Sequence, residues 1–314
     1  MTDSSHVAMG SGAEFDMIRR LLAEWGSRAH GIGDDAAILD IPAGERLVVS
    51  MDASVEHVHF RREWLSAEEI GARAAAAALS DLAAMAAMPS GLLLALALPE
   101  RWRGDVAALA RGVGAVATAA QCPIVGGNIT ASDALSLTIT VLGHSARPLR
   151  RSGAEPGDII FVTGLLGGPG AALRALLRGD IPAAEQRMRF AMPQPRLREA
   201  RWLADHGAHA AIDISDGLLG DAGHLARASG VSLELDADAL PCMPAVSAME
   251  AATSGEEYEL LVAMPPGVQL DARAFEGMFG VRLTQIGVVA VMGHEPVTMR
   301  GAQVSGLGSH DHLA

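Results

Sequence analysis

Short apolar runs alternate with longer helical patterns along the first half of the chain. Arg46–Asp52 is an apolar run of strand length that ends in an acid, and the alternating segment Val55–Phe60 is predicted to continue it. Ser66 and Glu69 have the spacing of a capping box ahead of an alanine-rich stretch, which predicts a helix to about Met88. We expect further strands at Gly91–Leu98 and Leu135–Gly143, with a helix between them at Asp105–Ala120.

A polar stretch rich in Pro, Gly and Arg, Ser145–Asp158, separates the two halves. We expect a domain boundary near its start, which divides residues 1–145 from residues 146–314. Beyond it the pattern predicts strands at Ile159–Thr163, Ala210–Ile214, Val231–Leu235, Glu259–Ala263 and Leu283–Val289, and helices at Ala171–Leu177, Arg196–Asp205, Asp221–Ser229 and Ala272–Phe279. The predicted class is therefore α/β or α+β, in two domains.

Composition and charge exclude several classes of protein. Half of the 314 residues are hydrophobic, which is ample for more than one core. The formal net charge of -13 argues against a nucleic-acid partner. All 24 basic residues are Arg, so P-loop enzymes, protein kinases and Schiff-base catalysis are excluded, because each depends on a lysine.

The sequence predicts a cytoplasmic protein without a membrane partner. No segment has the pattern of a secretory signal, and the most apolar strand-like run is too short to span a bilayer. The two cysteines, Cys122 and Cys242, form neither a disulfide framework nor a metal-binding spacing. We expect both to be small buried hydrophobic residues.

Aspartates occur where the pattern calls for apolar residues or turns. Asp81 lies inside the alanine-rich helix, where an isolated carboxylate is costly unless a cation such as Mg²⁺ or an arginine neutralises it. A structural ion pair or an N-cap would also explain Asp81, and a turn would explain Asp34. A helix N-cap would equally explain Asp216. The recurrence of acids at strand ends and turns nevertheless favours a shared metal site, with these candidates: Asp34, Asp35, Asp52, Asp81, Asp213 and Asp216.

Glycine and histidine patterns are less specific. Gly126-Gly127 is compatible with any tight turn. Gly164–Gly170 is typical of a loop that cradles phosphate at a helix N-terminus, or of an ordinary turn. His57 and His59 are expected on one strand face, where contact with a substrate is more plausible for one of them than a zinc site.

Seven motifs, taken in order, resemble thiamine-monophosphate kinases over nearly the whole chain. They are Gly31-Ile32-Gly33-Asp34-Asp35, Ser50-Met51-Asp52 through Phe60, Leu79-Ser80-Asp81-Leu82, Gly126-Gly127-Asn128-Ile129-Thr130, Arg151-Ser152-Gly153 through Asp158, Ile212-Asp213-Ile214-Ser215-Asp216-Gly217 and Ser254-Gly255-Glu256-Glu257-Tyr258-Glu259. The family belongs to a wider group with aminoimidazole ribonucleotide synthetase. The resemblance implies a two-domain fold, in which the N-terminal sheets of two copies pair into a β-barrel and a C-terminal α/β domain follows.

The resemblance also implies an ATP- and Mg²⁺-dependent enzyme with several metal ions and thiamine monophosphate as acceptor. The metal positions would be Asp35, Ser50, Met51, Asp52, Asp81, Asn128, Asp213 and Asp216. ATP would contact Gly127, Asn128, Arg151 and Ser215, and the substrate would contact His59, Glu256 and Leu307. No residue is assigned to proton transfer, since the acceptor phosphate is mostly dianionic at pH 7.

Three positions depart from the family pattern. Asn128 replaces an aspartate, Met51 replaces a threonine, and Leu307 stands where the family carries a tryptophan. Each change weakens one expected contact: a metal ligand, a hydroxyl and an aromatic surface for a cation. Two alternatives therefore stay open, namely a related ATP-dependent enzyme with another acceptor and a nucleotide-binding homologue without catalysis.

Overall fold

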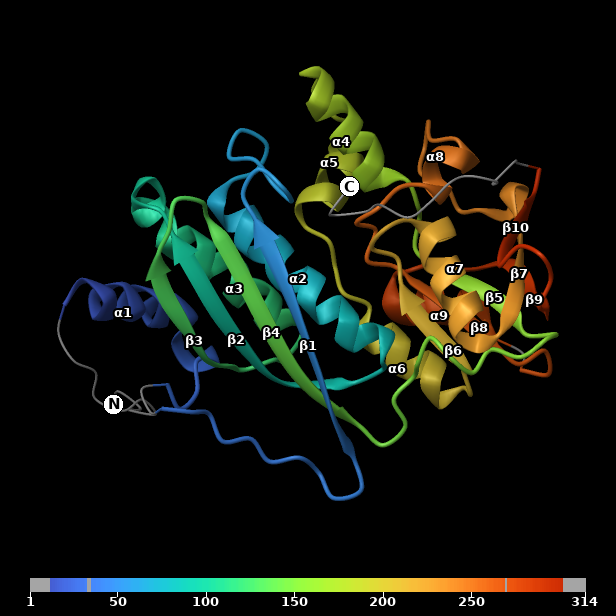
Figure 1. The fold of residues 1–314 in the computed structure, drawn as a ribbon, viewed down its shortest axis with the longest axis horizontal. Coiled ribbons are helices and arrows are strands. Elements are labelled where there is room, and N and C mark those ends of the chain that lie inside the picture. Colours follow the sequence, from blue (N-terminus) through green and yellow to red (C-terminus); the bar gives the residue numbers. More distant parts are fainter. Residues whose placement is uncertain (1–11, 33–34, 269, 302–314) are drawn as a thin grey trace. The chain divides into compact units, whose positions relative to one another are not determined.

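The computed structural model describes residues 12–32, 35–268 and 270–301 (Figure 1). Two compact units are present. The first comprises the described part of Met1–Leu82 together with Ala87–Arg147, and the second comprises Ala83–Ala86 and the described part of Pro148–Ala314. No helix in the described ranges combines the length and apolar character needed to cross a bilayer.

The first unit is an open four-stranded sheet with helices on one face (Figure 1). Its strands run in the order β1-β4-β2-β3, with β4 antiparallel to both neighbours and β3 parallel to β2. The elements, in chain order, are α1 (Ala13–Trp25), β1 (Arg46–Val55), α2 (Ala67–Ala84), β2 (Met88–Leu98), α3 (Val106–Ala119), β3 (Ile124–Ala131) and β4 (Ser136–Ser145).

The central helix α2 begins where the sequence predicts. The Glu69 carboxylate accepts a hydrogen bond from the Ser66 amide at 2.8 Å, and the Ser66 hydroxyl accepts one from the Glu69 amide at 3.3 Å, which confirms the capping box. The helix ends at Ala84 rather than near Met88, because the backbone turns left-handed at Ala86 (φ 49°). Its residues 70–80 are all buried, so the alanines serve close packing as well as helix propensity.

Two local predictions for this unit are wrong. Residues 56–60 do not continue β1, because the chain reverses there with His57 at φ 70° and a hydrogen bond from the His57 amide to the Phe60 carbonyl. His57 and His59 therefore do not share a strand face. Gly126-Gly127-Asn128 is not a turn either, since all three residues lie within β3.

The second unit is a six-stranded sheet in the order β10-β7-β9-β5-β8-β6, antiparallel except for β10 beside β7. Its strands are β5 (Ile159–Thr163), β6 (Ala210–Asp213), β7 (Val231–Asp236), β8 (Leu260–Met264), β9 (Leu283–Val291) and β10 (Val297–Arg300). Its helices are α4 (Gly168–Arg178), α5 (Ala184–Ala191), α6 (Leu197–Asp205), α7 (Leu218–Ser229), α8 (Ala248–Ala252) and α9 (Ala272–Phe279).

Both faces of this second sheet are buried. Along β8, Leu261 and Ala263 belong to a core shared with α7 and α8, whereas Leu260, Val262 and Met264 belong to a second core shared with α6 and α9. A strand that is buried on both faces is typically a continuous run of apolar residues, and β8 has this pattern in the sequence. The mixed α/β architecture in two parts is confirmed.

Candidate functional site

In the first unit, candidate residues of β1 and α2 meet on the helix-covered face of the sheet. The Ser50 hydroxyl donates a hydrogen bond to an Asp81 carboxylate oxygen, with the two oxygens 2.5 Å apart. Asp52 lies two residues along the strand and hence on the same face as Ser50. Asp81 cannot be an N-cap, because α2 begins at Ala67. Three hard oxygen-bearing side chains therefore lie on one face.

Two other candidates point to the opposite, open face. Met51 alternates with Ser50 and Asp52 along β1, and its side chain is 66% exposed. Asn128 on β3 pairs with the exposed Ala95 on β2. Ala95 pairs with Thr138 on β4, which in turn pairs with Ala53 on β1, so these four residues lie on the same face as Met51. The side chains of Met51 and Asn128 therefore do not join Asp81, and Met51 can offer that side of the sheet only its main-chain carbonyl.

Position 127 needs a glycine because the backbone of β2 passes close to it. A Cβ atom at this position would lie 2.0 Å from the Leu94 carbonyl oxygen on β2. Any side chain would thus force the parallel strands β2 and β3 apart.

A buried carboxylate fixes the turn that carries His59. Glu56 accepts hydrogen bonds from Arg101 at 2.6 Å, from the Trp102 ring nitrogen at 3.0 Å and from the Leu135 amide at 3.1 Å. Burial acts to raise the pKa of Glu56, but these donors together lower it. Within the turn, the Val55 amide donates to the Nδ1 atom of His59 at 3.1 Å, which holds the imidazole ring in one orientation.

In the second unit, Asp213, Ser215 and Asp216 lie between the end of β6 and the start of α7. A residue that the sequence analysis left out, Asp221, organises this turn. Its carboxylate accepts hydrogen bonds from the Ser215 amide at 3.0 Å and the Asp216 amide at 3.1 Å. The N-cap of α7 is Gly217, so the N-cap interpretation of Asp216 is wrong.

The carboxylates of this turn repel one another. Burial of Asp221, followed by the charges of Asp213 and Asp216, raises the pKa of Asp221 to about 7. No group of three or more His, Cys, Asp or Glu side chains forms a ready metal centre within the described ranges. The donor chemistry nevertheless fits a hard divalent cation, which would relieve the repulsion that the raised pKa reports.

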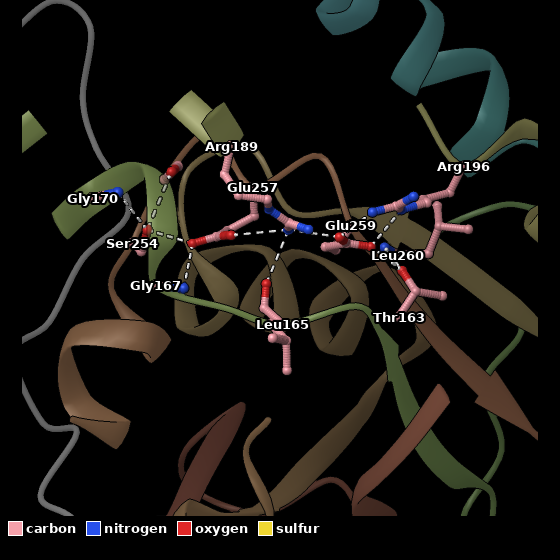
Figure 2. A network of polar contacts seen from close by, with 11 residues as sticks. Thr163, Leu165, Gly167, Gly170, Arg189, Arg196, Ser254, Glu257, Glu259 and Leu260 are labelled. Carbon is pink, nitrogen blue, oxygen red and sulfur yellow. Dashed lines mark hydrogen bonds and ion pairs between the residues drawn. The ribbon is translucent and has the colours of Figure 1, made fainter. Parts of the chain in front are cut away.

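In the glycine-rich segment Gly164–Gly170, two amides near the start of α4 are already bound by side chains of the protein (Figure 2). The Gly167 amide donates to Glu257 at 2.6 Å, and the Gly170 amide donates to the Ser254 hydroxyl at 3.0 Å. These two amides are thus not available to an external anion, which argues against the phosphate-cradle interpretation.

Next to this turn lies an ion-pair cluster around the fully buried carboxylate of Glu259 (Figure 2). Glu259 accepts two hydrogen bonds from Arg196, at 2.7 and 2.6 Å, one from Arg189 at 2.7 Å and one from the Thr163 hydroxyl at 2.6 Å. Burial acts to raise the pKa of Glu259, but Arg196 and Arg189 hold it below its ordinary value. Sequence reasoning missed this cluster, although the acids of Glu256–Glu259 beside a buried strand were a visible signal.

The structure brings two further candidates together in the second unit. The Glu256 amide donates to the Ser215 carbonyl at 2.6 Å, so the proposed substrate residue lies against the proposed ATP residue. Arg151 is exposed, and its charge helps to lower the pKa of His224 on α7, after burial and Arg227. Asp35 is described and exposed, whereas Asp34 and Leu307 lie outside the described residues.

Comparison with known proteins gives concordant matches. Residues 33–145 match the model of the AIR synthase related protein N-terminal domain, and residues 155–299 match that of the C-terminal domain. A thiamine-monophosphate kinase from Salmonella typhimurium is 37% identical over 276 residues, covering 82% of this chain and 83% of that protein.

Two solved structures extend the similarity. The thiamine-monophosphate kinase from Stenotrophomonas maltophilia superposes with a TM-score of 0.81 at 37% identity, covering 92% of this chain and 97% of the other. AaThiL complexed with AMPPCP and TMP superposes with a TM-score of 0.75 at 28% identity, covering 96% and 99% of the two chains.

Replacement of Asp221 by Asn tests the electrostatics of the Asp213–Asp216 turn. The folded protein favours protonated Asp221, since its pKa of about 7 exceeds the ordinary 3.8. The contribution of Asp221 to wild-type stability should therefore fall as pH rises from about 4 to about 7, by up to about 4 kcal/mol. Asn keeps a side-chain oxygen that can accept from the Ser215 and Asp216 amides, and it cannot ionise. The free energy of unfolding of Asp221→Asn should therefore equal that of wild type near pH 4 and exceed it at pH 8.

Urea unfolding at several pH values, with EDTA present to remove cations, measures this difference. Asp16→Asn on the exposed face of α1 is the control and should show no such trend. A difference in stability between Asp221→Asn and wild type that stays constant across this pH range would contradict the raised pKa of Asp221.

Proposed function

The chain belongs to the thiamine-monophosphate kinase family of AIR synthase related proteins, and from that premise we propose that it transfers the γ-phosphoryl group of ATP to thiamine monophosphate, forming thiamine diphosphate. The observation that carries the proposal is the 37% identity over four-fifths of the chain to a thiamine-monophosphate kinase. The AaThiL complex with AMPPCP, an ATP analogue, and TMP supports the same donor and acceptor. These relatives favour this reaction over the two alternatives left open by the sequence.

The reaction needs positioning and charge neutralisation more than proton transfer. The acceptor is a phosphate monoester with a second pKa of about 6, so at neutral pH it is mostly a dianion and already nucleophilic. The barrier comes from bringing two polyanions together in line. We assign no side chain to general acid or base catalysis.

The candidate residues divide between metal, nucleotide and substrate. Bound Mg²⁺ would supply charge neutralisation and orientation of the phosphates. We assign the oxygen ligands of several ions to Asp35, Ser50, the Met51 carbonyl, Asp52 and Asp81 in the first unit and to Asp213 and Asp216 in the second. Asn128, expected as a further ligand, has its side chain on the open face and would serve ions only on that side. Gly127, Asn128, Arg151 and Ser215 would contact ATP, and His59, Glu256 and Leu307 would contact thiamine monophosphate.

The chain's own geometry supports these roles. Ser50 orients the Asp81 carboxylate, and Asp221 orients the amides that precede and follow the Ser215 side chain. Arg151 presents an exposed guanidinium, which is suited to the triphosphate. The ring of His59 is held at Nδ1, and Glu256 offers a carboxylate to a cationic substrate.

ADP release from the purified protein tests the reaction. With ATP, Mg²⁺ and thiamine monophosphate, a coupled assay should show ADP formation that depends on both the acceptor and the metal. Mass spectrometry should identify thiamine diphosphate as the product. Absence of acceptor-dependent ADP at every Mg²⁺ concentration would refute the substrate assignment, whereas nucleotide binding alone would favour a non-catalytic homologue.

Asp81→Asn tests the metal assignment in the first unit. Asn keeps the size of the side chain and an acceptor for Ser50 but loses the negative charge. We expect kcat/KM to fall by at least about 100-fold, since loss of even an outer-shell partner of a metal costs up to that much. The measurement is steady-state kinetics with Mg²⁺ titrated, beside Asp16→Asn as control. Unchanged kinetics in a folded Asp81→Asn protein would remove Asp81 from the metal site.

We also propose a homodimer formed through the open face of the first sheet. Three apolar side chains of the edge strand β1 project from that face, Leu47, Val49 and Met51, at 52, 54 and 66% exposure. Adjacent apolar side chains on an edge strand need a cover, and a second copy would supply one by pairing the two sheets into a barrel.

Val49→Glu should convert the dimer into monomers, because it places a charge at the centre of this strip. Sedimentation equilibrium measures the change in mass. Ile181→Glu, at an equally apolar and 96% exposed position of the second unit, is the matched control and should stay dimeric. A wild-type monomer at micromolar concentration, or a dimeric Val49→Glu protein, would exclude this interface.

Two further expectations concern the location of the protein and its partners. We propose a cytoplasmic location, because the donor is ATP, and no nucleic-acid partner, because the net charge is -13. Cell fractionation with an antibody against the chain would test the location.

A further inference from the structure

We propose that Glu257 is a positioning residue for the substrate: it fastens the loop Ser254–Tyr258 to the glycine-rich segment Gly164–Gly170 and thereby holds Glu256 beside Ser215. The inference rests on the proposed function only in taking Glu256 as a substrate-binding residue. Neither the sequence motifs nor the metal assignments gave Glu257 a role.

The loop adopts a conformation that it would not hold by itself. Glu256 and Tyr258 have φ values of 60° and 50°, in the left-handed region that non-glycine residues rarely occupy. Such residues persist only where the surroundings over-determine them. The hydrogen bonds that this conformation permits run from the Glu256 amide to the Ser215 carbonyl and from the Tyr258 amide to the Ile214 carbonyl, at 2.6 and 2.9 Å.

Glu257, between these two residues, provides the anchor. One oxygen of its buried carboxylate accepts hydrogen bonds from the Gly167 amide at 2.6 Å and from the Ser254 hydroxyl at 2.5 Å. The Ser254 hydroxyl in turn accepts from the Gly170 amide at 3.0 Å (Figure 2). The loop is thus tied at two points to the start of α4.

Arg189 lies near the Glu257 carboxylate, but the short hydrogen bonds of this carboxylate come from neutral groups. Arg189 lies 3.6 Å from the second carboxylate oxygen of Glu257, beyond hydrogen-bond distance. Arg189 instead donates to Glu259 at 2.7 Å and to the Leu165 carbonyl at 3.0 Å. The short contacts of Glu257 are therefore those of its first oxygen, which accepts from neutral donors.

This division of contacts predicts how two substitutions differ. Glu257→Gln keeps a side-chain oxygen that can accept from both Gly167 and Ser254, so the loop should stay in place. Glu257→Ala removes the acceptor and with it the ties to Gly167 and Ser254, which weakens the hold on Glu256 and Tyr258 in the left-handed region.

Hydrogen exchange read by mass spectrometry tests the positioning directly, without reference to activity. In Glu257→Ala, exchange in a peptide covering residues 254–260 should accelerate by about tenfold or more, because the Glu256 and Tyr258 amides lose their protected geometry. Glu257→Gln should exchange like wild type. Ser247→Ala, which removes only the exposed cap of α8, controls for general destabilisation and should leave this peptide unchanged.

Kinetics provide the second readout. Glu257→Ala should raise KM for thiamine monophosphate about tenfold, with kcat and the KM for ATP within about threefold of wild type. Glu257→Gln should restore wild-type values. Inactivity of the wild-type protein toward thiamine monophosphate would count against the proposed function, and hydrogen exchange would still decide the role of Glu257.

Two results would overturn the inference. One is a folded Glu257→Ala protein whose loop exchanges at the wild-type rate, and the other is an equal rise in both KM values. If Glu257→Ala does not fold, Ser254→Ala takes its place, since it removes one of the two ties and should accelerate exchange in the same peptide.

Discussion

The buried carboxylate of Glu259 is the constraint on which the second unit depends. A charge removed from water is tolerated only with close, well-oriented partners, and loss of one partner leaves the others uncompensated. Here the partners are Arg196, Arg189 and Thr163, from the segment before α6, from α5 and from the end of β5. Even Gly164 is fixed by this group, because a Cβ there would lie 2.1 Å from a Glu259 oxygen. One side chain thus sets where four separate segments meet.

The cluster around Glu259 also fixes the position of the loop Ser254–Tyr258, which precedes β8. Glu259 anchors the start of the strand, and Glu257 ties the preceding residues to α4. The amides of Glu256 and Tyr258, on either side of Glu257, donate to the carbonyls of Ser215 and Ile214, and Asp221 accepts a hydrogen bond from the Ser215 amide. Two groups of candidate residues, separated by about forty positions in sequence, are therefore connected through main-chain hydrogen bonds, whose geometry depends on the side chain of Glu257.

Sequence reasoning succeeded where a local pattern determines the outcome. The helix Ala272–Phe279 has its predicted bounds, and the Ser66 cap begins α2 as expected, because amphipathic period and capping are properties of neighbouring residues. It failed at residues 56–60, where a strand-like alternation yields to the long-range contacts of Glu56 with Arg101, Trp102 and Leu135. It also failed at Gly127, whose absent side chain serves packing against β2 and not a turn. The acids at strand ends were found, but Asp221, which binds the amides of Ser215 and Asp216, was not, since it reads as an ordinary residue of the first turn of α7.

The faces of the first sheet explain how two departures from the family pattern can be accommodated. Ser50 and Asp52 lie toward α2 and Asp81, whereas Met51 and Asn128 lie on the other face. Met51, where the family resemblance leads us to expect a threonine, therefore brings no hydroxyl but leaves the Ser50–Asp81 hydrogen bond in place, and its side chain adds apolar surface beside Val49 and Leu47. Because strand alternation separates the two faces, the polar face can retain oxygen ligands while the open face becomes more apolar. The same substitution that weakens the motif thus strengthens the surface through which a second copy would associate.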